Sequence, residues 1–383
     1  MGPLTGTTII EIAGLGPGPF AAMSLADMGA DVIRVERPGG GLFADQQDPC
    51  LDVLNRGKRC IAADLKTVEG VNIVLTLVEK ADALLEGNRP GVMERLGLGP
   101  DTCLARNPRL VYGRMTGWGQ EGPLAGEVGH DLNYVALSGA LHAMGRAGEK
   151  PAIPLNLVGD FGGGGMMLAY GIVCALLEMK TSGKGQVVDA AMVDGAATLM
   201  ASTYAALQAG FWSDERGTNV LDSGSHFYEV YETADGKYIS IAPVEPQFYA
   251  AFLERLGEDT AGLENQWDMA NWPAFKAQLA DLFKQRSRDE WDSFFAGADI
   301  CYAPVLSLSE VRHHPHHQAR ATYLDDGNSW QPAPAPRFSR TPGEIRRPPA
   351  RTGAHSREIL AEFGFAETEI EALIDKGAVK QSD

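Results

Sequence analysis

The sequence predicts an α/β protein, in which a Rossmann-like large domain with a parallel sheet accompanies a smaller α+β domain. Two patterns carry this prediction. In the first 190 residues, short β-branched runs alternate with helical patterns and glycine turns, as in βαβ units. After residue 224, a hairpin pattern around Asp235-Gly236 precedes several helical segments. A chain of 383 residues is long enough for about two such domains.

The first half of the chain reads as repeated strand and helix. We expect a strand over 8–13, a glycine turn, a helix over 20–28 and a strand over 31–36, which together indicate a parallel pair. Further predicted elements are a helix over 69–80, strands over 83–86 and 110–115, and helices over 130–144 and 165–179. The turn Gly14-x-Gly16-x-Gly18 departs from the G-x-G-x-x-G spacing and contains two prolines, so it is weak support for nicotinamide binding.

The second half of the chain has a different pattern of predicted elements. It contains a long apolar helical stretch over 188–212, a hairpin over 224–245, and helices over 246–256, 273–285 and 289–296. Six prolines over 331–350 indicate an extended strap, and two capped tail helices follow over 356–364 and 368–377. We therefore expect a large domain over 1–190, a linking helix over 191–223, and a small domain over 224–330. Residues 331–383 are expected to return to the large domain.

Charge and cysteine usage limit the classes of function. A net charge of -17 argues against nucleic-acid binding and against a polybasic membrane surface. The longest apolar run, residues 166–177, is too short to span a bilayer, and the first residues show no secretory signal. The five cysteines (Cys50, Cys60, Cys103, Cys174 and Cys301) lack C-x-x-C spacing, which is typical of reduced thiols in a cytoplasmic protein.

No metal site is expected. The histidines at 313, 314, 316 and 317 are interrupted by Pro315, which breaks the spacing of helical metal ligands, so a solvated loop is the preferred interpretation.

The segment over 156–165 is the most informative local feature. An apolar, strand-like run ends on Asp160, and four glycines at 162–165 then open a long apolar helix. Four glycines suggest that something approaches the backbone closely, and their N–H groups can bind a negative charge that forms during a reaction. The alternative is that Asp160 is only a helix N-cap.

Ten motifs, taken in order, resemble the family III CoA-transferase superfamily and, within it, the α-methylacyl-CoA racemases. The resemblance covers nearly the whole chain. The motifs are Gly14 to Phe20, Gly29 to Pro38, Ala63 to Lys66, Glu86 to Gly91, Arg95 to Gly99, Thr116 to Gln120, Gly129 to Tyr134, Asn156 to Gly165, Ser182 to Gln186 and Val244 to Phe248.

This resemblance implies an interlocked homodimer with an acyl-CoA substrate, acting in fatty acid and lipid metabolism without a cofactor. It implies that His130 and Asp160 are the catalytic bases and that Glu245 pairs with the histidine across the dimer. The implied substrate- and CoA-binding positions are Arg37, Ala63, Asp64, Leu65, Lys66, Gly87, Asn88, Arg89, Arg95, Gly129, Asp131, Leu132, Asn133, Tyr134 and Asn156. Close relatives are expected to carry an aromatic residue at position 88, so Asn88 is a departure.

The residue types suit a proton transfer next to a thioester. Inversion of the α-carbon requires removal of a proton from one face and delivery to the other, for which two flanking bases are the natural design. A helix N-terminus lowers the pKa of Asp160, whereas burial raises it. One alternative on the same fold is CoA transfer with Asp160 as nucleophile. Another is a regulatory protein that binds CoA without catalysis.

Basic residues inside an acidic protein allow two interpretations. Lys58, Arg59, Lys66, Arg89 and Arg95 either form a solvated face or supply the local positive charge that CoA phosphates need.

Overall fold

A computed structural model describes residues 1–40, 51–325 and 329–382 of the chain. The chain forms two compact units. The large unit comprises Met1–Ser138, Leu155–Leu199 and Tyr323–Asp383, and the small unit comprises Gly139–Pro154 and Met200–Thr322. The predicted division at 190, 223 and 330 places 139–154 with the large domain, whereas these residues belong to the small unit.

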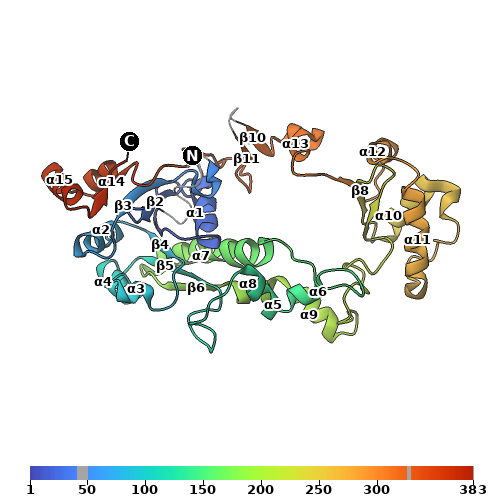
Figure 1. Cartoon of the computed structure of the whole chain (residues 1–383), viewed down its shortest axis with the longest axis horizontal. Coiled ribbons are helices and arrows are strands. Elements are labelled where there is room, and N and C mark those ends of the chain that lie inside the picture. Colours follow the sequence, from blue (N-terminus) through green and yellow to red (C-terminus); the bar gives the residue numbers. More distant parts are fainter. Residues whose placement is uncertain (41–50, 326–328, 383) are drawn as a thin grey trace. The chain divides into compact units, whose positions relative to one another are not determined.

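A seven-stranded sheet forms the centre of the large unit (Figure 1). Its order is β12-β3-β2-β1-β4-β5-β6, and every pair is parallel except that of β12 with β3. The order 3-2-1-4-5-6 is that of doubly wound nucleotide-binding sheets, so the predicted Rossmann-like class is confirmed. The strands are β1 (Thr8–Ile12), β2 (Asp31–Glu36), β3 (Arg59–Ala63), β4 (Ala83–Glu86), β5 (Val111–Thr116), β6 (Val187–Ala191) and β12 (Val379–Lys380).

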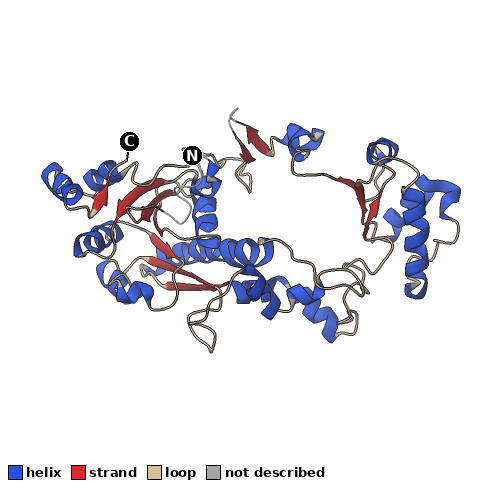
Figure 2. Cartoon of the chain, viewed as in Figure 1, coloured by secondary structure: helices blue, strands red, loops and turns tan. Residues whose placement is uncertain are grey.

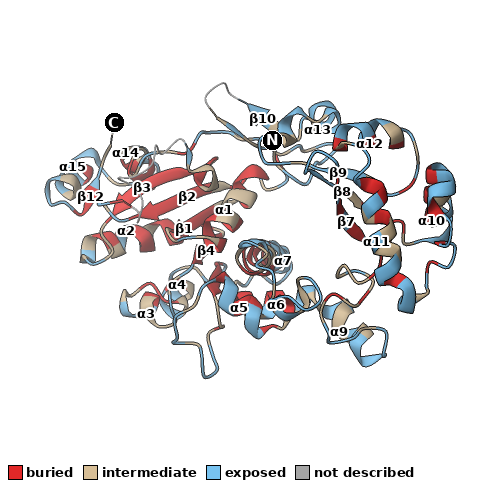
Figure 3. Cartoon of the chain, turned by 45° about the vertical axis from the view of Figure 1, so that its right-hand side comes forward, coloured by how far each residue is buried: buried red, intermediate tan, exposed pale blue. Residues whose placement is uncertain are grey.

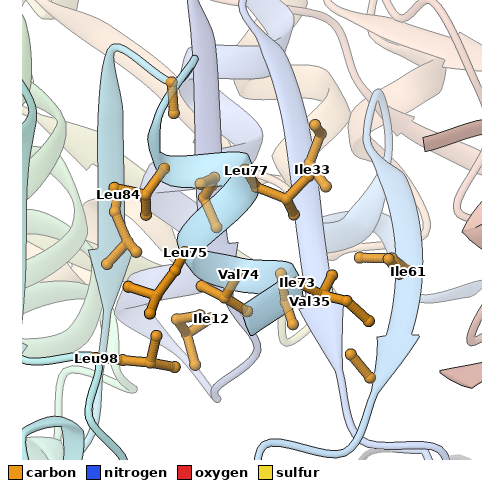
Figure 4. Close-up of a cluster of buried hydrophobic side chains, with 14 of the residues drawn as sticks. Ile12, Ile33, Val35, Ile61, Ile73, Val74, Leu75, Leu77, Leu84 and Leu98 are labelled. Carbon is orange, nitrogen blue, oxygen red and sulfur yellow. The ribbon is translucent and has the colours of Figure 1, made fainter. Parts of the chain in front are cut away.

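Helices cover both faces of this sheet, as Figure 2 shows. Alternate strand residues point to opposite faces, so Ile9 packs with α1 (Pro17–Asp27) and α7 (Met167–Ser182) in one core cluster. Ile10 lies in the second cluster, which α2 (Val68–Val78) covers; Figure 4 shows this cluster.

The other helices of the large unit are short. They are α3 (Val92–Arg95), α4 (Pro100–Arg106), α5 (Asp131–Leu137), η3 (Leu157–Met166), α8 (Met192–Leu199), α14 (Ser356–Glu362), α15 (Glu367–Asp375) and the 3-10 turn η2 (Val53–Asn55). A two-stranded antiparallel pair, β10 (Tyr323–Asp325) and β11 (Trp330–Pro332), precedes the tail. The tail then joins the sheet through β12, where the Ser356 hydroxyl accepts from the Ala62 N–H (3.2 Å) and donates to the Lys380 carbonyl (2.6 Å).

One helix is longer than the sequence indicated. The segments η3 and α7 are continuous over Leu157–Ser182, a stretch of 26 residues that is long and apolar enough to cross a membrane by length and composition. The expectation that the apolar run is too short is therefore wrong. The helix packs on β5, β6 and α1, and its buried face belongs to the core of the large unit.

The small unit contains an antiparallel three-stranded sheet with helices beside it (Figure 3). Its core is rich in aromatic side chains. Its strands are β7 (Glu229–Glu232), β8 (Tyr238–Ile241) and β9 (Tyr302–Val305). Its helices are α6 (Ala140–Ala143), α9 (Ala201–Gln208), α10 (Pro246–Leu256), η4 (Gly257–Thr260), η5 (Met269–Asn271), α11 (Trp272–Phe283), α12 (Arg288–Phe295), η6 (Val311–His313) and α13 (Pro315–Arg320). Fully buried Phe252, Phe283 and Trp291 are among the largest side chains of this core.

Several predicted elements have different bounds or identities. The predicted helix over 130–144 is two helices, α5 and α6, which belong to different units. The stretch over 188–212, predicted as helical, begins as strand β6 and continues as α8 and α9, so the expected linking helix over 191–223 is divided between the units. The four described cysteines carry free thiols, as predicted, and Cys50 lies outside the described residues.

Candidate active site

The carboxyl edge of the large sheet collects most of the predicted site. Parallel strands end at the same edge, and ligands of doubly wound sheets bind where the strand order reverses, here between β1 and β4. Arg37 follows β2, Lys66 follows β3, and Arg89 follows β4. The sheet therefore brings together residues that are far apart in the sequence.

Asp160 lies in the first turns of η3, a π-helix over Leu157–Met166. The expectation of a strand ending on Asp160 is therefore wrong, and so is the N-cap alternative, because Asn156 occupies the N-cap position. The residue that leads into this helix, Leu155, has a left-handed backbone (φ 56°), which is uncommon for a β-carbon-bearing residue. π-Helical segments are rare and occur frequently at functional sites.

The glycine tract serves packing instead of charge binding. A β-carbon at Gly163 would lie 2.6 Å from the Ala196 nitrogen on α8, and one at Gly165 would lie 2.8 Å from the Pro17 oxygen on α1. These glycines lie inside a helix whose N–H groups bond to carbonyls five residues earlier. The expectation that this tract donates N–H groups to a developing negative charge is therefore wrong. The close approach that four glycines indicate is that of helices α1 and α8.

The Asp160 carboxylate is half-buried and accepts few hydrogen bonds from the described residues. Among the described residues, its one hydrogen-bond donor is the Asn156 side-chain amide, 3.2 Å from Oδ2. Gly16 approaches it from the turn after β1, where a β-carbon would lie 3.0 Å from Oδ2. Burial raises the pKa of Asp160; the Asn156 hydrogen bond opposes this, the Asp131 charge adds to it, and His130 opposes it. The pKa of Asp160 is therefore raised, with burial as the largest cause.

His130 stands at the N-cap of α5 with extended backbone and an exposed side chain. The Asn133 side chain accepts from the His130 N–H (3.0 Å) and so fixes the start of the helix. Asp131, the next residue after His130, accepts from the Asp160 N–H (2.7 Å), and the charge of His130 lowers the pKa of the Asp160 carboxyl. The start of α5 therefore lies beside Asp160.

Tyr134 lies one turn after His130 on α5 and is buried. Its ring lies against the backbone at Gly117 and Gly129, where added β-carbons would come within 2.1 and 2.7 Å. Burial and the Asp160 charge raise the pKa of the Tyr134 hydroxyl, and the Arg89 cation opposes them. Arg89, a predicted CoA-binding residue, therefore lies within electrostatic range of the Tyr134 hydroxyl.

Glu245 occupies the N-cap of α10 in the small unit, with Pro246 as the first helical residue. Its side chain is exposed and makes no capping hydrogen bond, so it is free for another partner. Its pairing with His130 stays a prediction.

The predicted CoA-binding positions differ in how far they are buried. The exposed ones are Arg37, Lys66, Gly87, Arg89, Arg95, Leu132, Asn133 and Asn156. Asp64, Leu65 and Gly129 are half-buried, whereas Tyr134, Asp131 and Ala63 are buried; Ala63 pairs with Val379 in the sheet. Their contacts with CoA stay predictions.

Asn88 and Asp131 have protein partners of their own. The Asn88 amide donates to the Met93 sulfur (3.3 Å), and its N–H donates to the Glu86 carboxylate (2.6 Å), so the side chain turns toward the core. Asp131 Oδ1 accepts from the N–H of Asp160 (2.7 Å). A protein role for Asp131 was not visible in the sequence.

Two of the five basic residues are unavailable to phosphates. Lys58 is 1% exposed and pairs with Glu11 (2.7 Å), and Arg59 is 4% exposed and pairs with Asp31, Glu358 and Glu362. Both the solvated-face reading and the phosphate-binding reading are therefore wrong for these two. Arg89 and Arg95 are exposed and make no ion pair with any described residue.

The histidine cluster over 313–317 lies in η6 and α13 instead of the loop that the sequence indicated. Within residues 1–40, 51–325 and 329–382, no group of three or more His, Cys, Asp and Glu side chains is arranged to hold a metal ion.

Comparisons with known proteins agree with this geometry. Residues 4–356 match the family described as CoA-transferase family III. The chain is 46% identical to α-methylacyl-CoA racemase of Mus musculus, over 96% of this chain and 95% of the relative, and 43% identical to the Homo sapiens racemase, over 99% of both. It is also 30% identical to succinyl-CoA:glutarate CoA-transferase of Mus musculus, over 100% and 92%.

Solved structures show the same fold. A CAIB/BAIF family protein from Brucella suis superposes with a TM-score of 0.82 at 27% identity, covering 94% of this chain and 99% of that one. With the carboxyl-edge site, the ordered motifs and the match over residues 4–356, the conclusion is that this chain belongs to CoA-transferase family III.

Proposed function

We propose that this protein is an α-methylacyl-CoA racemase, which inverts the α-carbon of 2-methylacyl-CoA thioesters by proton transfer through an enolate. The observation that supports the proposal is the contact between the start of α5 and Asp160: Asp131, which follows His130, accepts from the Asp160 N–H at 2.7 Å, and burial raises the pKa of the Asp160 carboxyl. The 46% identity to a mouse enzyme of that name supports the substrate class.

In the proposed reaction, one base removes the α-proton and the other protonates the planar enolate from the opposite face. A pKa raised toward neutrality suits Asp160 to both halves of this cycle, because the carboxylate is a stronger base and its acid is more populated. His130 supplies the second base. Proton transfer leaves the oxidation state of the carbon unchanged, so the proposal requires no nicotinamide or flavin.

The surroundings of the pair support an acyl-CoA substrate. Leu132 (37% exposed) and Leu157 (56% exposed) place apolar surface next to His130 and Asp160, where an acyl chain is accommodated. The exposed Arg89, Arg95 and Lys66 at the same sheet edge provide the local positive charge for the CoA phosphates in an otherwise acidic protein.

We also propose a homodimer, in which Glu245 of one chain faces His130 of the other. The helix over 157–182 supports it with an exposed apolar stripe that includes Met166, Tyr170 and Leu177, at 49%, 68% and 69% exposure. Such a stripe on a core helix is typical of an interface.

Co-expression of His130→Ala and Glu245→Ala chains tests the cross-chain pairing. A verified heterodimer should carry one intact site and one doubly defective site, and so about half of the wild-type activity. Heterodimers without recovered activity contradict the pairing.

The activity itself is tested with a single enantiomer of a 2-methylacyl-CoA in deuterated water, with and without an acceptor acid. We expect inversion with deuterium at the α-carbon, and little acyl-CoA formed from the acceptor. The runner-up is CoA transfer with Asp160 as nucleophile, which the 30% identity to a CoA-transferase favours. Transfer to the acceptor that is faster than inversion would support CoA transfer. If neither reaction takes place, the result would support a protein that binds CoA without catalysis.

A further inference from the structure

Asp131 makes an unusual pair of contacts beside Asp160. It is the first residue of α5 and is 7% exposed. One carboxylate oxygen, Oδ1, accepts from the Asp160 N–H at 2.7 Å, and a β-carbon at Gly159 would lie 2.4 Å from the same oxygen. The other oxygen, Oδ2, is buried and has no hydrogen-bond partner among the described residues.

An unpaired buried carboxylate oxygen is costly, so its retention requires a reason. The bonded oxygen provides a structural one, because it satisfies an N–H in the first turn of η3, where a helix leaves N–H groups free. A neutral amide oxygen is able to accept the same bond. The charge on Asp131 and the unpaired second oxygen are therefore not explained by this contact.

The described groups around Asp160 do little to offset the negative charge of Asp131. From α5 come Asp131, His130 and Tyr134. From η3 itself comes only the neutral Asn156 amide. From α8, the titratable residue is Asp194, which lines a separate cleft with Arg114.

Helix α1 also offers few backbone N–H donors to the Asp160 carboxylate. It begins at Pro17 directly after Gly16, the residue that touches the Asp160 carboxylate, and Pro19 follows two positions later. Proline has no N–H, so the first turn of α1 presents few N–H groups to a neighbouring anion. Fixed cations and helix donors near the Asp160 carboxylate are thus few, while a second carboxylate lies beside it.

We propose that Asp131 is a positioning residue for the proton transfer: one oxygen fixes the backbone of Asp160, and its uncompensated negative charge keeps the Asp160 carboxylate basic. This inference rests on the proposed function, in which Asp160 carries the proton. Two carboxylates in one site raise the pKa of one of them, as in other acid–base sites. The raised pKa of Asp160, due first to burial and also to Asp131, agrees with this geometry.

The test is the substitution Asp131→Asn, which removes the charge and keeps an oxygen to accept the Asp160 N–H. The direct readout is the carboxyl titration of Asp160, followed by NMR with 13C-labelled aspartate and assigned by its loss in Asp160→Asn. We expect the Asp160 titration to move to lower pH by about one unit. The acid limb of the kcat/KM profile should move in the same direction.

Asp101→Asn is the matched control, because Asp101 is an exposed first-turn aspartate of α4 without contact to Asp160. It should leave both readouts in place. An unchanged Asp160 titration in Asp131→Asn, with only a lower Tm, overturns the proposal and leaves Asp131 as a helix cap.

The titration separates this inference from the proposed function. If Asp160→Asn retains full racemisation, the proposed mechanism fails. The NMR titration still decides whether the Asp131 charge acts on Asp160, since it does not depend on activity.

Discussion

The substitution Gly16→Ala probes how closely the turn after β1 fits the Asp160 carboxylate. Gly16 has φ of 63° and ψ of -113°, a positive-φ, mirror-β conformation that glycine adopts readily and that costs an alanine roughly 1–3 kcal/mol. The new β-carbon would lie 3.0 Å from Asp160 Oδ2 and 3.4 Å from its Cγ. The carboxylate must therefore move by a few tenths of an ångström.

This displacement should reduce catalysis more than binding. A misplacement of about 1 Å costs on the order of 100-fold in rate, so a shift of this size should lower kcat roughly 3- to 10-fold. KM for the acyl-CoA should change little, because the new β-carbon contacts only Asp160 and none of the predicted CoA-binding arginines. The assay is steady-state racemisation, with thermal unfolding of the full chain measured in parallel.

Substitutions at two other glycines separate the effect of backbone strain from the effect of the contact with Asp160. Gly6 also has a positive φ (86°) but has no atom within 4 Å of an added β-carbon, so Gly6→Ala should lower Tm and leave kcat unchanged. Gly18 lies in the same turn of α1 with open space around its β-carbon position, so Gly18→Ala should affect kcat little. Equal losses of kcat in Gly6→Ala and Gly16→Ala would refute the contact argument.

Two further predictions concern substrate binding and pH. Arg89→Ala and Arg95→Ala should each raise KM for acyl-CoA more than they lower kcat, and added salt should weaken wild-type binding. The control is Arg109→Ala, at the opposite edge of the sheet. An unchanged KM in both Arg89→Ala and Arg95→Ala would indicate that the two arginines are only surface charges. His226 is fully buried, and burial followed by the Lys276 charge lowers its pKa to about 4. Because the unfolded chain takes up this proton near pH 6.5, the stability that neutral His226 provides is present above that pH and is lost as pH falls toward 4. Between pH 8 and pH 5 the loss is about 2 kcal/mol, and His226→Gln should flatten the pH dependence of chemical unfolding; an equally steep dependence in the variant would contradict this assignment.

The strands and helices with strong local patterns were predictable from the sequence. Strands β1, β2 and β4 and helix α10 lie where the apolar runs and the Glu245-Pro246 helix start indicated. Strand β3 was missed because it begins with charged Arg59, whose partners, Glu358 and Glu362, lie about 300 positions away. Strand β6 was read as the start of a helix, because its apolar residues continue without a break into α8.

The candidate site was likewise only partly predictable from the sequence. His130 and Asp160 were identified by motif, and in the structure the start of α5 contacts the backbone of Asp160. The role of the glycine tract was not predictable, because it depends on Pro17, Phe20 and Ala196 packing against η3 from other helices. Likewise, the burial of Lys58 depends on Glu11, a partner 47 positions away on another strand. Local sequence reports the chemistry of a side chain, whereas its neighbours come from the fold.

The central claim is that His130 and Asp160 act on opposite faces of the α-carbon. The most direct measurement is the exchange of the α-proton in deuterated water, followed separately for each enantiomer of a 2-methylacyl-CoA in Asp160→Asn and His130→Ala. Both variants should lose inversion, because the enolate then lacks an acid on one face. Residual exchange with retention should favour opposite enantiomers in the two variants. Near-wild-type inversion by Asp160→Asn, or the same enantiomer preference in both variants, would contradict the two-base account.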